Sequence, residues 1–211
     1  MYPAFLHFSH SPSRLFLLTA MHLHDRFAEF LSASEIIEAT PALLNDQRRR
    51  FVSSPDIVLQ PNSVESVQKI MRFCFENRIR VTPQGGNTGL CGATVTTEGV
   101  LLNLSKLNRI RDINLADNSM TVEAGVILQN AQKAAAEAGR LFPLSLASEG
   151  SCQIGGNIAC NAGGLNVLRY GSMRDLVLGL EVVLPNGELV SHLQPLHKNT
   201  TGYDLRHLFI G

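Results

Sequence analysis

The sequence lacks the charge excess, the cysteine spacing and the long apolar runs that mark several classes of protein. Its 18 basic and 18 acidic residues leave a formal net charge of zero, and no basic stripe indicates a nucleic-acid partner. The four cysteines form no CxxC pair and have no histidine at ligand spacing, which argues against a zinc site or a disulfide framework (Cys74, Cys91, Cys152 and Cys160). Such unpaired thiols favour a cytoplasmic protein. No run of about 18 apolar residues exists, so no membrane span is predicted.

The first twenty residues contain no acidic side chain and lead into the apolar stretch RLFLLTAM. A targeting peptide usually carries more positive charge ahead of such a stretch than Arg14 alone supplies. We therefore expect residues 1–20 to be a disordered leader, with a targeting role as the alternative. The remaining length and a hydrophobic content of 45% are enough for a substantial core, as one large domain or two small lobes.

Lysine, arginine, aspartate and glutamate are missing from two glycine-dense runs, at 83–92 and 150–164, which hold nine of the 17 glycines. Glycine lets a ligand approach backbone N–H groups closely. The first run ends without the GK[ST] of a Walker loop and contains no GxGxxG, so nucleotide hydrolysis and NAD binding are disfavoured. Either run alone could simply reverse the chain. Together they indicate one extended ligand, such as a dinucleotide with a pyrophosphate and a ring system.

Strand-like and helix-like segments alternate along the rest of the chain. Apolar residues at helical spacing predict helices over 24–39, 64–77 and 128–139. Short apolar runs predict strands within 56–61, 78–86, 99–107 and 120–125, and the sequence LVLGLEVVLPNGELV at 176–190 predicts a hairpin turning at its Asn-Gly. This mixture predicts an α+β fold rather than an all-parallel, doubly wound sheet.

Several ordered motifs carry a family resemblance: GGNTGL at 85–90, GGN at 155–157, NAGG at 161–164, RYG at 169–171 and DLVLGLEVVLPNGE at 175–188. Together they resemble the FAD-binding half of the vanillyl-alcohol-oxidase-type flavoproteins. Within that superfamily the chain most resembles the D-2-hydroxyacid dehydrogenases, including the D-2-hydroxyglutarate and D-lactate branch. The resemblance implies the PCMH-type fold, in which FAD lies between two α+β subdomains.

The resemblance runs from about Phe51 to Gly211 and implies a division of the chain. A helical segment over 21–50 is expected to precede a first FAD-binding subdomain over 51–106. A second subdomain over 107–211 is expected to be incomplete at its C-terminus, with a boundary near Leu104 to Ile110. The rest of the cofactor domain and the substrate domain are expected beyond residue 211.

The resemblance also implies which residues hold the cofactor. Backbone amides of the first run, with the side chains of Asn87 and Thr88, are expected to bind the pyrophosphate. The second run, as an irregular loop, is expected to meet the flavin, with Asn157 and Asn161 as donors and acceptors; the alternative is that these asparagines only stabilise turns. Arg169 is expected to orient the loop or a carboxylate. The full predicted set is Pro83, Gly85, Gly86, Asn87, Thr88, Gly89, Leu90, Gly92, Gly150, Ser151, Ile154, Gly155, Gly156, Asn157, Asn161, Ala162, Gly163, Gly164, Arg169, Tyr170 and Gly171.

Some superfamily members tether the flavin through a histidine in the first run, and residues 83–92 contain none, so FAD is expected to bind non-covalently. The implied reaction removes the hydroxyl proton of a D-2-hydroxyacid to a base and transfers its α-hydrogen as hydride to flavin N5. A separate acceptor then takes the electrons. No catalytic residue and no metal ligand is assigned, because the base and the substrate-binding groups are expected beyond residue 211.

Two other interpretations remain open from the sequence. The chain could be a complete, non-catalytic flavin- or nucleotide-binding module, which would be stable, yellow and monodisperse. It could also be an inactive truncated fragment with exposed apolar surface, which would aggregate or oligomerise. A homodimer is compatible with the sequence.

Overall fold

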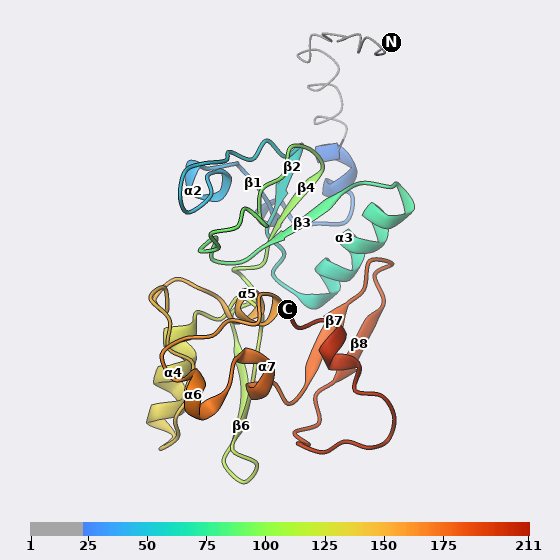
Figure 1. The fold of residues 1–211 in the computed structure, drawn as a ribbon. Helices are drawn as coiled ribbons and strands as arrows, with labels where there is room; N and C mark the ends of the chain where they lie inside the picture. The colour runs from blue at the N-terminus through green and yellow to red at the C-terminus, as the bar shows by residue number, and fades with distance from the viewer. Residues whose placement is uncertain (1–22) are drawn as a thin grey trace, which may run out of the picture.

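A four-stranded mixed sheet organises the first lobe of the molecule (Figure 1). The structure is a computed structural model that describes residues 23–211, so the predicted leader lies outside the described residues. The strands are β1 (Ile36–Ile37), β2 (Ile57–Leu59), β3 (Val81–Gln84) and β4 (Val100–Asn103), in the order β1-β2-β4-β3. Strands β2, β4 and β3 are parallel, and every residue of β2 and β4 is buried. This confirms the strands predicted from the continuous apolar runs, as expected for parallel strands covered on both faces.

Helix α3 (Val64–Glu76) makes the crossover from β2 to β3. It begins at Ser63, whose hydroxyl accepts a hydrogen bond from the backbone N–H of Ser66 at 3.1 Å. Val67, Ile70 and Cys74 form its buried face and pack against the sheet. Burial raises the pKa of the Cys74 thiol to about 12, so this cysteine stays protonated at neutral pH. The prediction of a helix over 64–77 is confirmed.

The single helix predicted over 24–39 is wrong. Residues 23–28 are helical, a 3-10 turn follows at Ala33–Glu35, and the chain then enters β1, antiparallel to β2. The helix ends at residue 28, and the next turn begins at Ser32, whose backbone N–H donates to the carboxylate of Glu35 at 3.0 Å and whose hydroxyl donates to the same group. This local bonding starts a new turn. The following pair of β-branched isoleucines then pairs with β2 as a strand. A short helix, α2 (Pro41–Leu44), completes this region.

The second lobe contains the hairpin of β5 (Ile110–Asn114) and β6 (Ser119–Val122) and four helices. The helices are α4 (Leu128–Glu137), α5 (Ile154–Ala159), α6 (Val167–Tyr170) and α7 (Met173–Leu176). Helix α4 was predicted, and the chain turns at Gly139 with a φ of +69°. Strand β5 was not predicted, because Arg111 and Asp112 interrupt its apolar pattern. The interpretation of the second glycine run as an irregular loop is wrong, because α5 lies in its centre.

Two hydrophobic cores correspond to the two lobes. The first core includes Phe27, Leu59 and Ile70, and the last of its buried residues along the chain is Leu107. The second core contains Val126, Leu128, Ala131, Leu144, Cys152, Ile154 and Met173, and Ile110 packs against it. The change from one core to the other therefore falls between residues 107 and 110.

The predicted hairpin forms from β7 (Leu180–Val183) and β8 (Leu189–His192). It leans against the first lobe: Val183 packs on the first core, and the Gln68 side chain on α3 donates to the carbonyl of Gly187 at 3.1 Å. Figure 1 shows this hairpin beside the lower end of α3. A 3-10 turn, η2 (Leu205–Leu208), follows. Among residues 23–211 there is no helix with the length and apolar character needed to span a bilayer.

Candidate functional site

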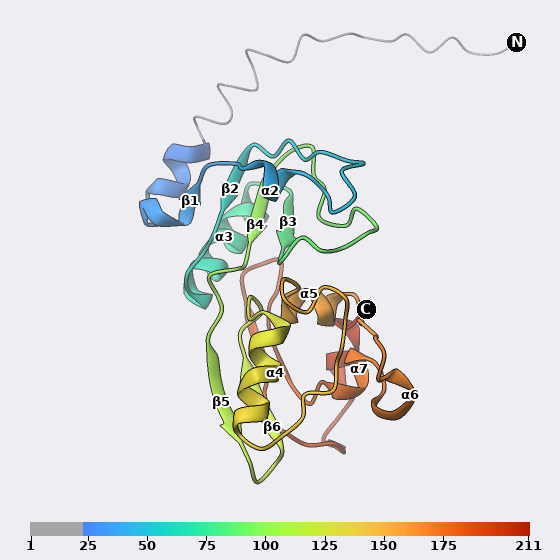
Figure 2. The same ribbon diagram turned by 90° about the vertical axis from the view of Figure 1, so that its left-hand side faces the viewer.

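The two glycine runs meet at the junction of the lobes. The first run leaves the carboxyl end of β3 in the parallel sheet, the edge where α/β sheets commonly bind ligands. A β-carbon added to Gly86 would overlap the carbonyl oxygen of Ser151, and one added to Gly85 would lie 3.1 Å from Oε1 of Gln153. Figure 2 shows α5, from the second run, directly below the end of β3. The two runs are therefore in direct contact.

The backbone of the first run has unused hydrogen-bond donors. Among the residues that the structure describes, no backbone N–H from Gly85 to Cys91 donates to a protein acceptor. These residues are half-buried or exposed, so the N–H groups can reach solvent or a ligand. A series of unpaired backbone donors is the arrangement that binds phosphate groups.

A buried network of polar side chains fixes the start of this run. The Asn103 amide donates to the carbonyl of Gly85 at 3.4 Å and to Oε1 of Gln84 at 3.3 Å. The Gln84 amide in turn donates to the carbonyl of Leu43 at 2.9 Å. Gln84 and Asn103 are opposite each other in the parallel register and are each 2% exposed. Neither residue was predicted from the sequence, although a polar residue at the end of two apolar strands is a usable signal.

The asparagines of the two runs point into the protein. Asn87 has a φ of +52°, and its amide donates to the carbonyls of Ala42 at 3.1 Å and Asn45 at 2.7 Å. Both amide hydrogens are therefore used, so the predicted role of this side chain as a phosphate donor does not fit the geometry. Oδ1 of Asn161 accepts from the backbone N–H of Arg174 at 2.9 Å.

Asn157 is 5% exposed, and its amide lies 3.6 Å from Sγ of Cys152. For Asn157 and Asn161 the geometry supports the alternative of a structural role, and the Asn87 side chain likewise holds the first run to a distant part of the chain. In the part of the chain that the structure covers, the hydroxyl of Thr88 makes no hydrogen bond, so it remains available as a donor.

The glycines divide into packed and open positions. A β-carbon on Gly155 would lie 2.7 Å from that of Ala124, and one on Gly164 would overlap the carbonyl of Ser145. By contrast, a β-carbon on Gly89 or Gly156 would have no atom within 4 Å. Chain packing therefore accounts for the first pair but not for the second, which leaves surface open for a ligand.

The remaining predicted residues have varied environments. Ile154 is 4% exposed and belongs to the second core, whereas Leu90 is 55% exposed. The Arg169 guanidinium lies 5.4 Å from the centre of the Tyr170 ring on α6. In both Figure 1 and Figure 2 α6 lies further from β3 than α5 does, so this pair is not brought to the first run. The other members lie along the two runs and their ends: Pro83 in β3, Gly92 against Phe51, Gly150 and Ser151 at the surface, Ala162 at the edge of the second core, Gly163 beside Val167 and Gly171 beside Asp175.

A buried amide without a partner lies where the runs meet. Gln153 is 7% exposed, and its Oε1 has no hydrogen-bond donor among residues 23–211. Most buried polar atoms in proteins are paired, so an unpaired one needs an explanation. A dinucleotide fits this junction for three reasons. Backbone N–H groups are unused on one side, the Gln153 side-chain oxygen has no donor, and two glycine positions are open. Within the described range, no three side chains of the metal-binding types are grouped so that they could hold an ion.

Comparisons with known proteins agree with this geometry. Residues 55–192 match the family model described as FAD binding domain. Over 191 residues the chain is 42% identical to the D-2-hydroxyglutarate–pyruvate transhydrogenase of Saccharomyces cerevisiae. The aligned region covers 88% of this chain and 38% of that protein. It is 46% identical over 167 residues to the D-2-hydroxyglutarate dehydrogenase of Xanthomonas citri pv. viticola, covering 79% of this chain and 35% of the relative.

The fold is similar to that of an alkyldihydroxyacetonephosphate synthase, with a TM-score of 0.77, 16% identity, and coverage of 90% of this chain and 40% of that structure. At this identity the likeness concerns the fold alone. The chain thus spans little more than a third of the length of the curated relatives named above.

Proposed function

This chain belongs to the FAD binding domain family, and from that premise we propose that it is the cofactor-holding part of a longer flavin-dependent dehydrogenase of D-2-hydroxyacids. Its fold is the α+β fold of FAD-binding flavoproteins, and FAD is its cofactor. The proposal for the substrate is supported by the names of the two relatives, which act on D-2-hydroxyglutarate. The observation that carries the proposal is the contact between two glycine runs that leave backbone donors and open glycine positions free.

The chain's own residues would bind and orient the cofactor. Backbone N–H groups from Gly85 to Cys91, with the Thr88 hydroxyl, would hold the pyrophosphate, because they have no other acceptor among the described residues. The open surface at Gly89 and Gly156 would allow close approach of the cofactor, and the Gln153 amide would complete its bonding at the junction. The absence of a histidine from residues 83–92 supports non-covalent binding.

The proposed reaction converts the alcohol carbon of a D-2-hydroxyacid to a ketone. When bound, FAD supplies the acceptor, at its N5 atom, for the hydride that leaves the α-carbon. The hydroxyl proton goes to a base, and a separate acceptor takes the two electrons afterwards. We propose that the base and the groups that bind the substrate carboxylate belong to the part of the longer protein outside this chain. The four free cysteines support a reducing, cytoplasmic location as part of the proposal.

Replacing Gly156 with valine tests the cofactor site. Among the described residues, a β-carbon at Gly156 would have no neighbour within 4 Å, so we expect valine to block FAD with little effect on the fold. We expect the variant to lose bound flavin absorbance after gel filtration with excess FAD, while its melting temperature without FAD stays unchanged. Gly202→Val is the matched control, because Gly202 is equally open and lies in a different loop. A variant that retains FAD as the wild type does would contradict the site.

Anaerobic addition of substrate tests whether this chain holds the cofactor while the rest of the longer protein supplies the catalytic groups. We expect flavin bound to the 211-residue chain to stay oxidised when D-2-hydroxyglutarate or D-lactate is added. The longer protein should bleach under the same conditions. Bleaching of the 211-residue chain itself would show that its own residues complete the active site. Failure of the longer protein to bleach with either acid would reject the proposed substrate class.

A further inference from the structure

Three consecutive arginines, Arg48, Arg49 and Arg50, form an exposed loop after α2. In the part of the chain that the structure covers, their guanidinium groups make neither a hydrogen bond nor an ion pair, and only their backbone groups are bonded. Adjacent charges of one sign repel one another. Such a loop therefore attracts an anion more strongly than isolated cations on the surface do.

A buried carboxylate holds this arginine loop in one conformation. Asp46 is 4% exposed, and its side chain accepts from the backbone N–H groups of Arg48 at 3.3 Å, Arg50 at 2.6 Å and Phe51 at 2.8 Å. The bond from Phe51 is the main reason why the pKa of Asp46 lies below its usual value, although burial opposes the shift. The carboxylate thus stays charged at neutral pH and bonds the backbone, while the arginine side chains are left exposed.

The segment that carries the arginines contacts the first glycine run on both sides of the loop. The Asn87 amide donates to the carbonyl of Asn45 at 2.7 Å, and a β-carbon on Gly92 would lie 3.5 Å from the ring of Phe51. The Cα atom of Arg50 is one peptide unit, about 3.8 Å, from that of Phe51. In both Figure 1 and Figure 2 the loop after α2 and the loop after β3 project to the same side of the first lobe. The arginine loop is therefore next to the free N–H groups.

The glycine runs themselves contain no positive charge for a phosphate. Residues 83–97 have no charged side chain, and residues 150–164 have no lysine or arginine. Both phosphates of a pyrophosphate are ionised at neutral pH, whereas backbone N–H groups supply dipoles and no net charge. The formal net charge of the whole chain is zero, so the protein as a whole does not attract an anion. Positive charge at the site must come from a neighbouring segment.

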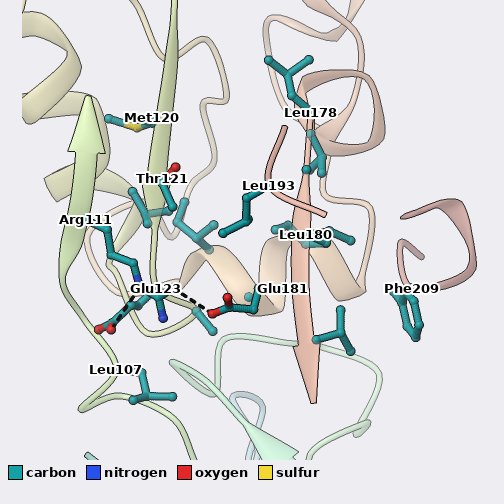
Figure 3. A pocket seen from close by; sticks show the side chains of 18 of the residues that line it. Leu107, Arg111, Met120, Thr121, Glu123, Leu178, Leu180, Glu181, Leu193 and Phe209 are labelled. Atoms are coloured by element: carbon teal, nitrogen blue, oxygen red, sulfur yellow. Dashed lines mark hydrogen bonds and ion pairs between the residues drawn. The ribbon is translucent and has the colours of Figure 1, made fainter. Parts of the chain in front are cut away.

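The arginine in the cavity between the lobes is already paired. This cavity has a volume of about 590 Å³ and adjoins the glycine runs, since Pro83 and Gly155 line it. Arg111 also lines it and donates from Nη1 to Oε1 of Glu181 at 2.8 Å (Figure 3). The Nε atom of the same arginine lies 3.4 Å from Oε1 of Glu123. Two carboxylates thus neutralise this guanidinium.

The arginine that contacts the second run is also bonded. The backbone N–H of Arg174 donates to Oδ1 of Asn161 at 2.9 Å, which places this residue beside the second run. Its guanidinium donates to the carbonyls of Ile210 and Gly211. Of these three cationic groups, only the arginine loop has guanidinium groups without a partner within residues 23–211.

We propose that the arginine loop is the cationic part of the FAD site and draws the pyrophosphate of the cofactor toward the free N–H groups of the first run. This inference rests on the proposed function. With Asp46 offsetting one arginine, two positive charges remain for the two phosphates. A local patch of one sign raises association rates by tenfold or more, and it acts over a screening length of about 8 Å at physiological salt. The loop therefore controls how fast FAD is captured, and the N–H groups control how long it stays.

Stopped-flow quenching of flavin fluorescence tests the loop. The loop variant replaces all three arginines of the loop with glutamine. The control variant makes the same change at three exposed positions on α3 or just after it: Lys69, Arg72 and Arg78. Figure 1 shows α2 and α3 on opposite sides of the first lobe. Both variants remove the same formal charge, so they separate a local effect from an effect of net charge.

At low ionic strength we expect the loop variant to associate with FAD about tenfold more slowly than the wild type, and the control variant to match the wild type. Dissociation rates should be unchanged in all three proteins. The difference in association should vanish at about 1 M salt, where the screening length is only about 3 Å. Melting temperatures without FAD should be equal, because the replaced side chains make no hydrogen bond or ion pair in the described part of the chain.

A single-residue pair repeats the comparison if a triple variant does not fold. Arg49 and Arg78 are both exposed and both have a left-handed backbone, with φ values of +54° and +55°. Arg49→Gln and Arg78→Gln therefore remove one charge each at equal backbone strain. We expect Arg49→Gln alone to slow association, by about twofold, which is a third of the tenfold effect on a logarithmic scale.

Two results would overturn the inference. Equal association rates for the loop and control variants would leave the arginines as a solvated surface or a contact for an acidic protein. Faster release of FAD at an unchanged association rate would make the arginines direct phosphate ligands instead. A wild-type chain that does not bind FAD would reject the cofactor site itself, and the inference with it, whereas binding with equal rates rejects only the role of the loop.

Discussion

The two glycine runs are similar in composition but differ in what their glycines do. In the first run the backbone N–H groups from Gly85 to Cys91 have no protein acceptor among the described residues. In the second run most N–H groups are used, α5 forms, and Gly155 and Gly164 press against Ala124 and Ser145. Only Gly156 of the second run resembles the open positions of the first. Glycine richness therefore has two causes here, space for a ligand and close contact between chain segments.

The largest expected loss of folding stability follows from substituting a packed glycine. Gly164→Ala would drive a methyl group into the backbone carbonyl of Ser145, and we expect it to destabilise the fold by about 3 kcal/mol. Thermal unfolding without FAD measures the loss. Gly163→Ala is the matched control, since its methyl would meet only the side chain of Val167 at 3.1 Å and should cost less than about 1 kcal/mol. Equal melting temperatures for the two variants would show that contact with the backbone carbonyl of Ser145 costs no more than contact with the movable side chain of Val167.

The next largest loss of stability is expected at Glu123, next to the residues whose carbonyls bind the second run. Gly155 and Ile154 donate to the carbonyls of Ala124 and Val126, and the preceding Glu123 is held by the Arg109 side chain at 2.8 Å. Burial alone would raise the pKa of Glu123, but hydrogen bonds from the side chain and backbone of Arg109 outweigh it and hold this pKa below its usual value. We expect Glu123→Gln to lower stability by about 2 kcal/mol at pH 7.

The pH dependence of that variant follows from the lowered pKa. The charged form of Glu123 stabilises the fold above the pH where a free glutamate titrates, about 4.3, and the contribution is lost as the pH falls through the lower folded-state pKa. Denaturant titrations of both proteins between pH 7 and pH 3 should therefore converge at the acidic end. A difference that stays constant over this range would show that the carboxylate charge is not the source.

A smaller effect is expected at an open glycine of the first run. Gly89→Val should weaken FAD binding about tenfold, or by about 1.4 kcal/mol, and leave the melting temperature of the protein without FAD unchanged. Quenching of flavin fluorescence on titration gives the dissociation constant. Loss of stability without any loss of affinity would place Gly89 among the packed glycines instead.

The smallest effect is expected at Asn87, which connects the first run to the end of α2. Asn87→Ala removes two hydrogen bonds to backbone carbonyls and should cost about 1 kcal/mol of stability, with a slight weakening of FAD binding. Asn87→Gly removes the same side-chain hydrogen bonds but adopts the left-handed backbone without strain. Comparing the two variants therefore separates the cost of backbone strain from the cost of the lost hydrogen bonds. If the alanine variant instead lost FAD completely at unchanged stability, the side chain would be a cofactor ligand after all.

The first lobe could largely be predicted from the sequence because its central strands β2 and β4 are buried on both faces. The segments around Leu59 and Leu101 read as continuous apolar runs, and Ser63 marks the start of α3. The helix predicted over 24–39 ends at residue 28 instead, and a local bond between Ser32 and Glu35 begins a separate turn despite the apolar spacing. Strand β5 was missed because Arg111 and Asp112 interrupt its apolar pattern, and the Arg111 side chain pairs with Glu123 and Glu181 instead of entering a core.

The position of the candidate site could be predicted from the sequence, but the roles of its individual side chains could not. Both glycine runs were identified, and the structure places them in contact. The roles of Asn87 and Asn161 depend on acceptors and donors distant in sequence, such as the carbonyl of Ala42 and the N–H of Arg174, which no local pattern reveals. The buried amide of Gln153 was missed for the same reason.

The central claim is that both glycine runs contact one FAD molecule. Hydrogen–deuterium exchange during an FAD titration of the 211-residue chain tests it most directly, because the backbone N–H groups of Gly85 to Cys91 and of Gly156 have no acceptor within residues 23–211 when no ligand is bound. We predict that both sets gain protection together, with the same half-saturating FAD concentration. Protection of one set alone, or of neither while FAD is bound, would contradict the account.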